Sequence, residues 1–214
     1  MNRADVPELL EDPTLPADVV AAAYRNLAGT QRFLGNTRAI FRQLRKHRDP
    51  IRLIVDIGCG QGALLEEIQK TLGVDVIGFD LRPAPSGRVK ILTGNAAVDP
   101  LPRADVALAV CVVHHLSEAE IIALIRNVSK SCRRLILLDL VRHWIPLTLF
   151  RVFVAPFLHR INAADGLTSV KRAYTPRELR AIVDEAVKGS DARVDHTVAP
   201  FYVRQVIDIE FKVK

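Results

Sequence analysis

The chain has 214 residues, of which 49% are hydrophobic and 25% are charged. This balance is typical of a soluble globular protein and excludes a disordered or collagen-like chain, and the length suits one domain with at most a modest appendage. The three cysteines include no CxxC pair, which argues against a disulfide framework or a structural zinc site and favours the reducing cytoplasm. The net charge of +6 permits an anionic partner, but no run of five basic residues demands one.

No segment for targeting or membrane insertion is recognisable. The first twelve residues include four acidic ones, whereas a signal peptide needs a basic start and an apolar run. The most apolar stretch, residues 144–158, is shorter than the roughly 20 residues that span a bilayer, and Pro146, Arg151 and Pro156 interrupt it. We therefore expect no membrane span and a cytoplasmic protein.

The N-terminal part of the chain reads as a mobile, acidic start followed by helices. Pro13 and Pro16 punctuate the start, and from residue 18 to residue 47 apolar side chains recur near the 3.6-residue period of an α-helix. Gly29 and Gly35 are expected to break this segment into two or more helices.

From residue 51 onward, strands and helices alternate. Short apolar runs predict strands at 51–57, 74–79, 89–92, 105–113 and 134–140, and a closing hairpin at 193–198 and 201–211. Helices are predicted at 63–71, 117–130 and 175–187, with Ser117 and Thr175 as N-caps, and residues 144–160 form a proline-marked helical insertion. This alternation predicts an α/β fold in which helices cover both faces of a mostly parallel sheet. Ligands of such sheets bind at the carboxyl ends of the strands.

A glycine-rich turn follows the first of these strands. Gly58, Gly60 and Gly62 alternate there, which permits a tight turn whose amides face an oxygen-rich ligand. Asp56 precedes the turn inside the apolar strand, where a buried carboxylate is costly without a partner. It fits either hydrogen bonds from loop amides or a cationic ligand, and it disfavours the dinucleotide site that a GxGxxG/A pattern would otherwise permit.

The second strand ends at Asp80, twenty residues beyond Gly60. A carboxylate at this position can accept hydrogen bonds from both hydroxyls of a ribose. With this acid in place, four segments of the chain together resemble the class I S-adenosylmethionine-dependent methyltransferases. They are IVDIGCGQG, VIGFD, GNAAVDPLP–ADVALAVCVVHHL and LILLDL.

The resemblance implies a Rossmann-like, seven-stranded, mostly parallel sheet that ends in an antiparallel hairpin. It implies S-adenosylmethionine as methyl donor and S-adenosyl-L-homocysteine as product, with the methionine portion against the glycine loop, the ribose on Asp80 and the adenine beside Asn95 and Ala96. The family more often has Asp where this chain has Asn95, whose side-chain oxygen can still accept a hydrogen bond from an adenine amino group. The predicted donor-binding residues are Asp56, Gly58, Cys59, Gly60, Gly62, Asp80, Leu81, Asn95, Ala96, Val112 and Arg32.

Acceptor chemistry is expected at the ends of the fourth and fifth strands. His114 and His115 follow the fourth strand, and a neutral histidine can remove a proton from an acceptor. His115 is the preferred base, although either side chain could simply pack in the loop. Arg142, past the fifth strand, could clamp a carboxylate or phenolate or instead form a structural ion pair. No metal ion is expected, because the histidines and cysteines lack ligand spacing.

The insertion and the N-terminal helices complete the prediction. Residues 144–174 are expected to roof the acceptor site; a core helix or a dimer face would also explain them, and no basic amphipathic face indicates a membrane surface. The segments LAGTQRFLGN and DG–TS–KRAY resemble a bacterial subgroup of small-molecule methyltransferases, often associated with polyketide-like pathways. That resemblance implies that Tyr24, Arg32 and Asn36 close over the donor and that Arg172 meets the acceptor.

We therefore expect a methyltransferase domain at 49–214 behind an N-terminal helical cap at 1–48, acting as a monomer or homodimer. The expected partner is a small, mainly hydrophobic or aromatic acceptor that is methylated on oxygen or carbon. An RNA or protein acceptor is an alternative that the basic charge supports, although neither an NPPY motif nor a separate nucleic-acid-binding domain is present. A non-catalytic protein of the same fold is a further alternative, and a NAD oxidoreductase is disfavoured because no hydride-transfer site is found.

Overall fold

The structure is a computed structural model that describes residues 1–12, 14–46, 49–82 and 88–212. Its sheet has seven strands, which are β1 (Leu53–Ile57), β2 (Asp75–Asp80), β3 (Ile91–Thr93), β4 (Ala104–Val110), β5 (Cys132–Asp139), β6 (Arg193–Val198) and β7 (Gln205–Glu210). The α-helices are α1 (Ala17–Phe33), α2 (Asn36–Lys46), α3 (Ala63–Leu72), α4 (Glu118–Val128), α5 (Trp144–Phe153), α6 (Arg160–Arg172) and α7 (Pro176–Ala186). Short 3-10 helices occur at η1 (Leu9–Glu11), η2 (Val113–His115), η3 (Ala155–Phe157) and η4 (Pro200–Tyr202).

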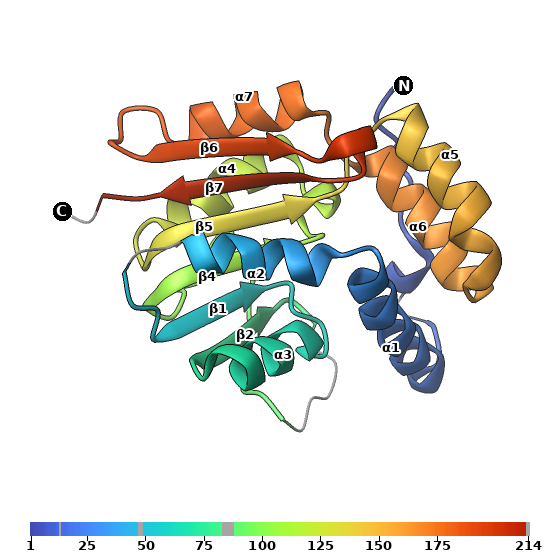
Figure 1. Cartoon of the computed structure of the whole chain (residues 1–214), viewed down its shortest axis with the longest axis horizontal. Coiled ribbons are helices and arrows are strands. Elements are labelled where there is room, and N and C mark those ends of the chain that lie inside the picture. Colours follow the sequence, from blue (N-terminus) through green and yellow to red (C-terminus); the bar gives the residue numbers. More distant parts are fainter. Residues whose placement is uncertain (13, 47–48, 83–87, 213–214) are drawn as a thin grey trace.

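The strand order across the sheet is β3-β2-β1-β4-β5-β7-β6 (Figure 1). Neighbouring strands from β3 to β5 are parallel, whereas β7 runs antiparallel to both β5 and β6. The predicted seven-stranded, Rossmann-like sheet with a C-terminal antiparallel hairpin is therefore confirmed.

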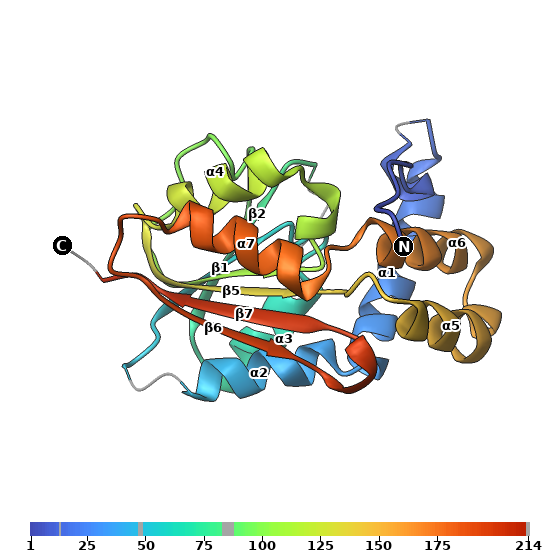
Figure 2. The ribbon, with the colours of Figure 1, turned by 90° about the horizontal axis from the view of Figure 1, so that it is seen from above.

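Helices cover both faces of the sheet (Figure 2): α4 and α7 lie on one face, and α2 and α3 lie on the other. Successive side chains of β1 alternate between these layers, because Val55 and Ile57 pack with α4 and α7 while Ile54 packs with α2 and α3. A strand that is buried on both faces needs apolar side chains at consecutive positions. This requirement explains the continuous apolar runs that predicted the sheet.

The helices differ from the prediction in the N-terminal part of the chain and after β5. Helix α1 continues through Gly29, and the break comes at Gly35, which has a positive φ of 78° and joins α1 to α2. After β5, the insertion contains the predicted apolar helix α5 and also α6, which the sequence pattern did not reveal. The predicted N-caps Ser117 and Thr175 are both confirmed, each within a capping box.

Three helices gather at one end of the molecule. Figure 1 shows α1, α5 and α6 beyond the carboxyl ends of the parallel strands. Residues 1–12, which were expected to be mobile, lie against α6: the Ala4 amide donates to the Lys171 carbonyl at 3.1 Å, and the Leu9 and Leu10 amides donate to the Asp165 carboxylate. The N-terminal segment and the insertion therefore both lie over the edge of the sheet where ligands of this fold class bind.

The predicted division of the chain at residue 48 remains a prediction. Helix α2 packs its Ile40 and Leu44 side chains into the core beneath the sheet, whereas α1 lies against α6. Within the ranges given above, the structure contains no helix that is both long enough and apolar enough to cross a membrane.

Candidate active site

The glycine loop lies between β1 and α3 and turns sharply. Gly58, Gly60 and Gly62 have φ values of 70°, 55° and 77°, a left-handed conformation that residues with a Cβ rarely adopt. A Cβ on Gly58 would lie 2.4 Å from the side chain of Val112, and a Cβ on Gly60 would lie 3.2 Å from the ring of Tyr24. The loop is therefore held between the end of β4 and helix α1, and the donor contacts expected of Val112 and Tyr24 stay predictions.

Asp56 is buried at the end of β1, with 3% of its surface exposed. No residue in the described part of the chain donates a hydrogen bond to its carboxyl group, so the loop amides do not serve as its partners. Burial, and then the charge of Asp80, raises the pKa of Asp56 to about 8. Burial followed by the charges of Asp56 and Asp80 also raises the pKa of the neighbouring Cys59 thiol to about 12. The protein thus keeps an unpaired carboxyl group beneath the glycine loop.

Asp80 ends β2 and faces the same loop. One carboxylate oxygen accepts a hydrogen bond from the Gly60 amide at 2.8 Å, and the other accepts one from the Arg82 amide at 2.8 Å. Each oxygen keeps a second lone pair with which it could accept a hydrogen bond from a ligand hydroxyl. The adjacent Leu81 is 60% exposed.

Asn95 and Ala96 form the turn that follows β3. The Asn95 side-chain oxygen accepts a hydrogen bond from the Ala97 amide at 2.9 Å, and the Asn95 amide donates to Asp99 at 2.7 Å. Asn127 of α4 donates to the Ala96 carbonyl at 3.0 Å. The Asn95 oxygen that was expected to meet an adenine therefore also shapes its own turn.

The two histidines form η2, directly after β4. His114 is buried, and its Nδ1 lies 2.7 Å from the carboxylate of Asp139 at the end of β5. The same carboxylate accepts a hydrogen bond from the His114 backbone amide at 3.0 Å. Because β4 and β5 are parallel neighbours, their carboxyl ends bring these two residues together, and Asp139 fixes the orientation of the His114 ring.

His115 is more accessible and contacts the N-terminal segment. Its Nδ1 lies 2.6 Å from the Glu11 carboxylate, and its Nε2 lies 4.0 Å from the Glu8 carboxylate. Glu8 also lies 3.6 Å from His114 Nε2 and accepts a hydrogen bond from the Ser169 hydroxyl at 2.6 Å. A buried carboxylate from residue 8 thus stands between the two histidines.

The charges of this cluster shift the pKa values of the two histidines in opposite directions. Burial alone would lower the pKa of His114, but the Asp139 and Glu8 carboxylates outweigh burial and raise that pKa to about 9. Burial and the neighbouring His114 cation lower the pKa of His115 below its usual value. Near pH 7, His114 is therefore protonated and His115 is neutral.

Arg142 does not reach an open acceptor site. Each of its guanidinium nitrogens already donates a hydrogen bond, to the carbonyls of Met1 and Ala173 and to the carboxylate of Glu178. Its side chain is almost fully buried by these contacts. The structural alternative thus describes Arg142 in this structure, with Glu178 as its ion-pair partner.

Arg172 and Asn36 both contact residues that directly follow β4, and the roles that the subgroup resemblance implied for them toward acceptor and donor stay predictions. Arg172 donates to Glu11 at 2.7 Å and is thereby joined to His115 through a shared carboxylate. Asn36 is buried beside Cys111 at the end of β4, with its side-chain amide 3.8 Å from the Cys111 sulfur.

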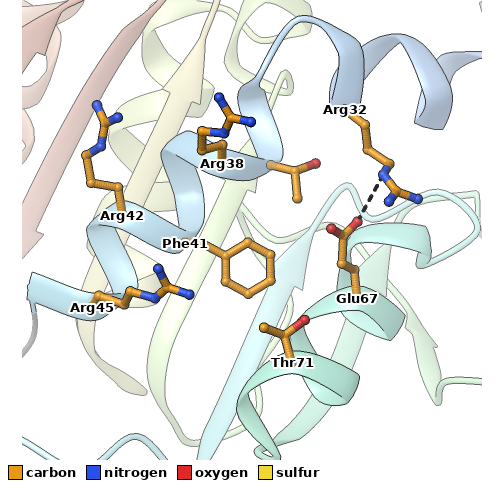
Figure 3. Close-up of a pocket in the computed structure, with 8 residues that line it drawn as sticks. Arg32, Arg38, Phe41, Arg42, Arg45, Glu67 and Thr71 are labelled. Carbon is orange, nitrogen blue, oxygen red and sulfur yellow. Dashed lines mark ion pairs between the residues drawn. The ribbon is translucent and has the colours of Figure 1, made fainter.

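Arg32 lies elsewhere, with 70% of its side chain exposed and 3.6 Å from Glu67. Both residues line an outer groove of about 580 Å³ between α2 and α3 (Figure 3). Exposed arginines from one face of α2, at positions 38, 42 and 45, line the same groove. None of the lining residues belongs to the glycine loop, the Asp80 turn or the histidine pair, so this groove is separate from those residues, and donor binding by Arg32 stays a prediction.

Sequence reasoning missed the carboxylates that surround the histidines. Asp139 could have been found, because its strand end adjoins that of the histidines. Glu8 and Glu11 gave no signal, since more than 100 residues separate them from His114 and His115.

Glu8, His114 and His115 could together offer three ligand atoms to a metal ion. This grouping is not one that the sequence predicted. Each of these side chains also has a contact within the protein: Glu8 with Ser169, His114 with Asp139, and His115 with Glu11.

Comparison with known proteins places this site in a family. A family model described as an O-methyltransferase domain matches residues 27–143, which is more than half of the chain and includes the glycine loop, Asp80 and both histidines. The chain belongs to the O-methyltransferase domain family. This membership confirms the predicted enzyme class, an S-adenosylmethionine-dependent methyltransferase, together with its methyl donor. No curated protein sequence gives a significant match to the chain.

Solved structures share the fold of this O-methyltransferase. The plantazolicin methyltransferase BpumL, in complex with SAH, has a TM-score of 0.70 at 15% identity, over 95% of this chain and 93% of that one. The plantazolicin methyltransferase BamL has a TM-score of 0.73 at 12% identity, over 91% of each chain. The mitomycin 7-O-methyltransferase MmcR has a TM-score of 0.55 at 18% identity, over 75% of this chain and 49% of that one. At these identities the similarity shows the common fold.

Proposed function

We propose that this O-methyltransferase transfers a methyl group from S-adenosylmethionine to a hydroxyl oxygen of a small, mainly hydrophobic or aromatic acceptor. The observation that carries the proposal is the His115 ring, whose Nδ1 lies 2.6 Å from Glu11 and which lies at the sheet edge that also holds the glycine loop. A neutral imidazole held by a carboxylate through Nδ1 has a free lone pair on Nε2, which is what removal of a hydroxyl proton needs.

The donor side fits S-adenosylmethionine. The donor carries a cationic sulfonium and an ammonium group, and the unpaired, buried Asp56 carboxyl is a group that a nearby cation would stabilise in its charged form. The free lone pairs of Asp80 suit ribose hydroxyls, and the absence of side chains at Gly58 and Gly60 lets a ligand approach the backbone. When bound, the donor supplies an electrophilic methyl group.

The residues of this chain hold and move the acceptor proton. His115 Nε2 accepts the proton from the acceptor hydroxyl, and the imidazolium that forms is stabilised by Glu11 at Nδ1 and by Glu8 near Nε2. His114 stays protonated between Asp139 and Glu8, and its positive charge keeps His115 neutral beforehand. Base catalysis of this kind contributes about 10²–10⁴-fold to a rate, and alignment of the reacting atoms contributes the larger share.

The preference for an apolar acceptor rests on the insertion. Helices α5 and α6 lie beyond the carboxyl ends of the strands (Figure 2). The two helices pack closely at Gly166 of α6, where a Cβ would lie only 2.2 Å from the Phe150 ring of α5. The fold similarity to the mitomycin 7-O-methyltransferase MmcR, an enzyme named for O-methylation of mitomycin, supports the same class of acceptor.

The test is methyl transfer from radiolabelled S-adenosylmethionine to a panel of phenols and to a cell extract. We expect label in the small, organic-extractable fraction, and an initial rate about 10²–10⁴-fold lower with the His115→Ala variant. The Arg38→Ala variant, altered in the outer groove, serves as matched control and should retain activity. Label that is sensitive to nuclease or protease would instead establish the RNA or protein alternative.

A further inference from the structure

An apolar surface lies exposed at the end of the molecule that carries the insertion. It is formed by α5, η3 and η4, and we call it the α5 surface. Its large hydrophobic side chains, with their exposed fractions, are Trp144 (63%), Val152 (53%), Phe153 (65%), Phe157 (85%), Phe201 (68%) and Tyr202 (43%). Single exposed apolar residues are normal on a protein surface, whereas a group of this kind indicates a binding surface.

The exposure follows from the way α5 packs. Trp144, Thr148, Arg151 and Val152 follow an i, i+4, i+7, i+8 spacing and are all exposed, so they share one outward face of the helix. The opposite face includes Pro146, the one α5 residue whose side chain is fully buried. Ile145, Leu147, Leu149 and Phe150 are half-buried, whereas the apolar side chains on the outward face gain little stability from packing in the described structure. Those exposed side chains are therefore not explained by the core.

The segment η4 adds aromatic side chains beside α5. Phe201 and Tyr202 both have a φ of 58°, a left-handed conformation that is strained for residues with large side chains. Tyr202 stacks on His143 with ring centroids 4.4 Å apart, which joins η4 to the start of α5. This strained turn holds Phe201 outward.

The charge around the α5 surface has one sign. Residues 140–164 contain no Asp or Glu, and neither do residues 196–207. Arg151 and Arg160 are exposed, and the described residues provide neither with an ion-pair partner. A second copy of the chain docked on this face would bring two positively charged surfaces together, which is unfavourable.

We propose that the α5 surface docks this protein on a lipid bilayer that contains anionic lipids. Tryptophan and other aromatic side chains favour the boundary between headgroups and acyl chains, and basic side chains near an anionic membrane add attraction that falls with salt. The proposal departs from the expectation drawn from the sequence, because the fold adds the exposed Phe201 and Tyr202 of η4 to the aromatic and basic residues of the insertion.

The docked surface would adjoin the acceptor side of the active site. Helix α6, which packs on α5, also supplies Asp165, Ser169 and Arg172 to the contacts with the N-terminal segment. If the proposed function holds, an apolar acceptor could pass from the bilayer toward His115. Membrane docking itself does not depend on that function and is tested separately.

The chain offers a direct probe, because Trp144 is its only tryptophan. The experiment adds vesicles of phosphatidylcholine mixed with phosphatidylglycerol, or of phosphatidylcholine alone, to the full-length protein. We expect a blue shift of tryptophan emission and co-sedimentation with the mixed vesicles, and both effects should weaken as salt is added. Phosphatidylcholine vesicles alone should bind less protein.

Variants separate docking from non-specific adsorption. The Phe153→Ser/Phe157→Ser double variant should lower the partition coefficient by at least about tenfold, as expected for two phenyl groups that leave a lipid interface, and Arg151→Glu should lower it further. Val98→Ser removes an apolar residue that is 71% exposed near the opposite edge of the sheet, and it should bind like the wild type.

The proposal is overturned if the emission of Trp144 does not shift with mixed vesicles, or if the double variant partitions as the wild type does. It is also overturned if the wild type dimerises without lipid and the double variant does not, because the occupant is then a second copy. Methyl transfer to water-soluble phenols by the double variant would show that the site is intact.

Discussion

Replacement of Asp56 by Asn tests whether the donor site holds an unpaired carboxyl group at the expense of stability. Burial and the charge of Asp80 raise the pKa of Asp56 from 3.8 to about 8 in the folded, ligand-free protein. Between these two values the folded state keeps a proton that the unfolded state releases. The free energy of unfolding therefore falls as pH rises through this window, and the loss is complete above the folded pKa.

The magnitude follows from the width of the window. Each pH unit within it lowers the free energy of unfolding by about 1.4 kcal/mol, so the carboxyl group destabilises the fold by about 4 kcal/mol near pH 7. Asn does not ionise, but it buries an amide without a partner, which costs about 1–3 kcal/mol. We expect the Asp56→Asn protein to be about 1–3 kcal/mol more stable than the wild type near pH 7, and to lack this fall with pH.

Urea unfolding followed by circular dichroism, at successive pH values within the window, measures both quantities. Titration calorimetry then measures the affinity for S-adenosylmethionine, which should fall about 10–100-fold because a charge-assisted contact is lost. Stability curves of the two proteins that run parallel between pH 4 and 8 would refute the reasoning, whatever their offset. A stabilised variant with unchanged donor affinity would show that Asp56 does not serve the donor.

The remaining predictions concern three other site residues. Asp80→Ala should weaken donor binding about 10–100-fold, because the ribose contacts and the support of the Gly60 amide are lost; unchanged affinity in the same calorimetric titration would remove the ribose assignment. His115→Ala should lower kcat about 10²–10⁴-fold while donor affinity stays within about twofold, and undiminished turnover at every pH would rule out this base. Asp139→Asn removes the main partner that raises the pKa of His114 to about 9. The raised pKa stabilises the wild type below about pH 6.5, and this stabilisation is lost as pH rises toward 9. We expect this stabilisation to be smaller in the variant. Urea unfolding across that range measures the difference, and identical pH dependence in the two proteins would contradict it.

Much of the fold could be predicted because its rules are local. Buried parallel strands need continuous apolar runs. Ser117 and Thr175 mark where their helices begin, because their side chains cap the first turn. The position of the helix break could not be predicted in the same way. Both Gly29 and Gly35 could have ended α1, and the choice depended on tertiary contacts at Gly35, where the side chain of Arg204 lies 3.5 Å from the Cβ position.

The donor side of the site was predictable for a different reason. Asp56, Gly58 and Asp80 lie at the ends of neighbouring strands, so topology alone brings them together. The acceptor side has no such rule. Glu8 reaches the histidines through tertiary packing against α6. The exposed position of Arg32 depends on which face of α1 is directed toward the solvent, and the periodicity of that helix did not predict this orientation.

The residues that define the family are not the residues that complete the acceptor side. A fragment limited to residues 27–143, the matched region, would contain the glycine loop, Asp80, Asp139 and both histidines. It would leave His115 without Glu11 and His114 without Glu8, because both carboxylates come from the N-terminal segment that α6 holds in place. The matched region therefore holds the histidines of the proposed acceptor side but not the carboxylates that contact them. In this chain those contacts depend on the first dozen residues and on α6, both outside the matched region.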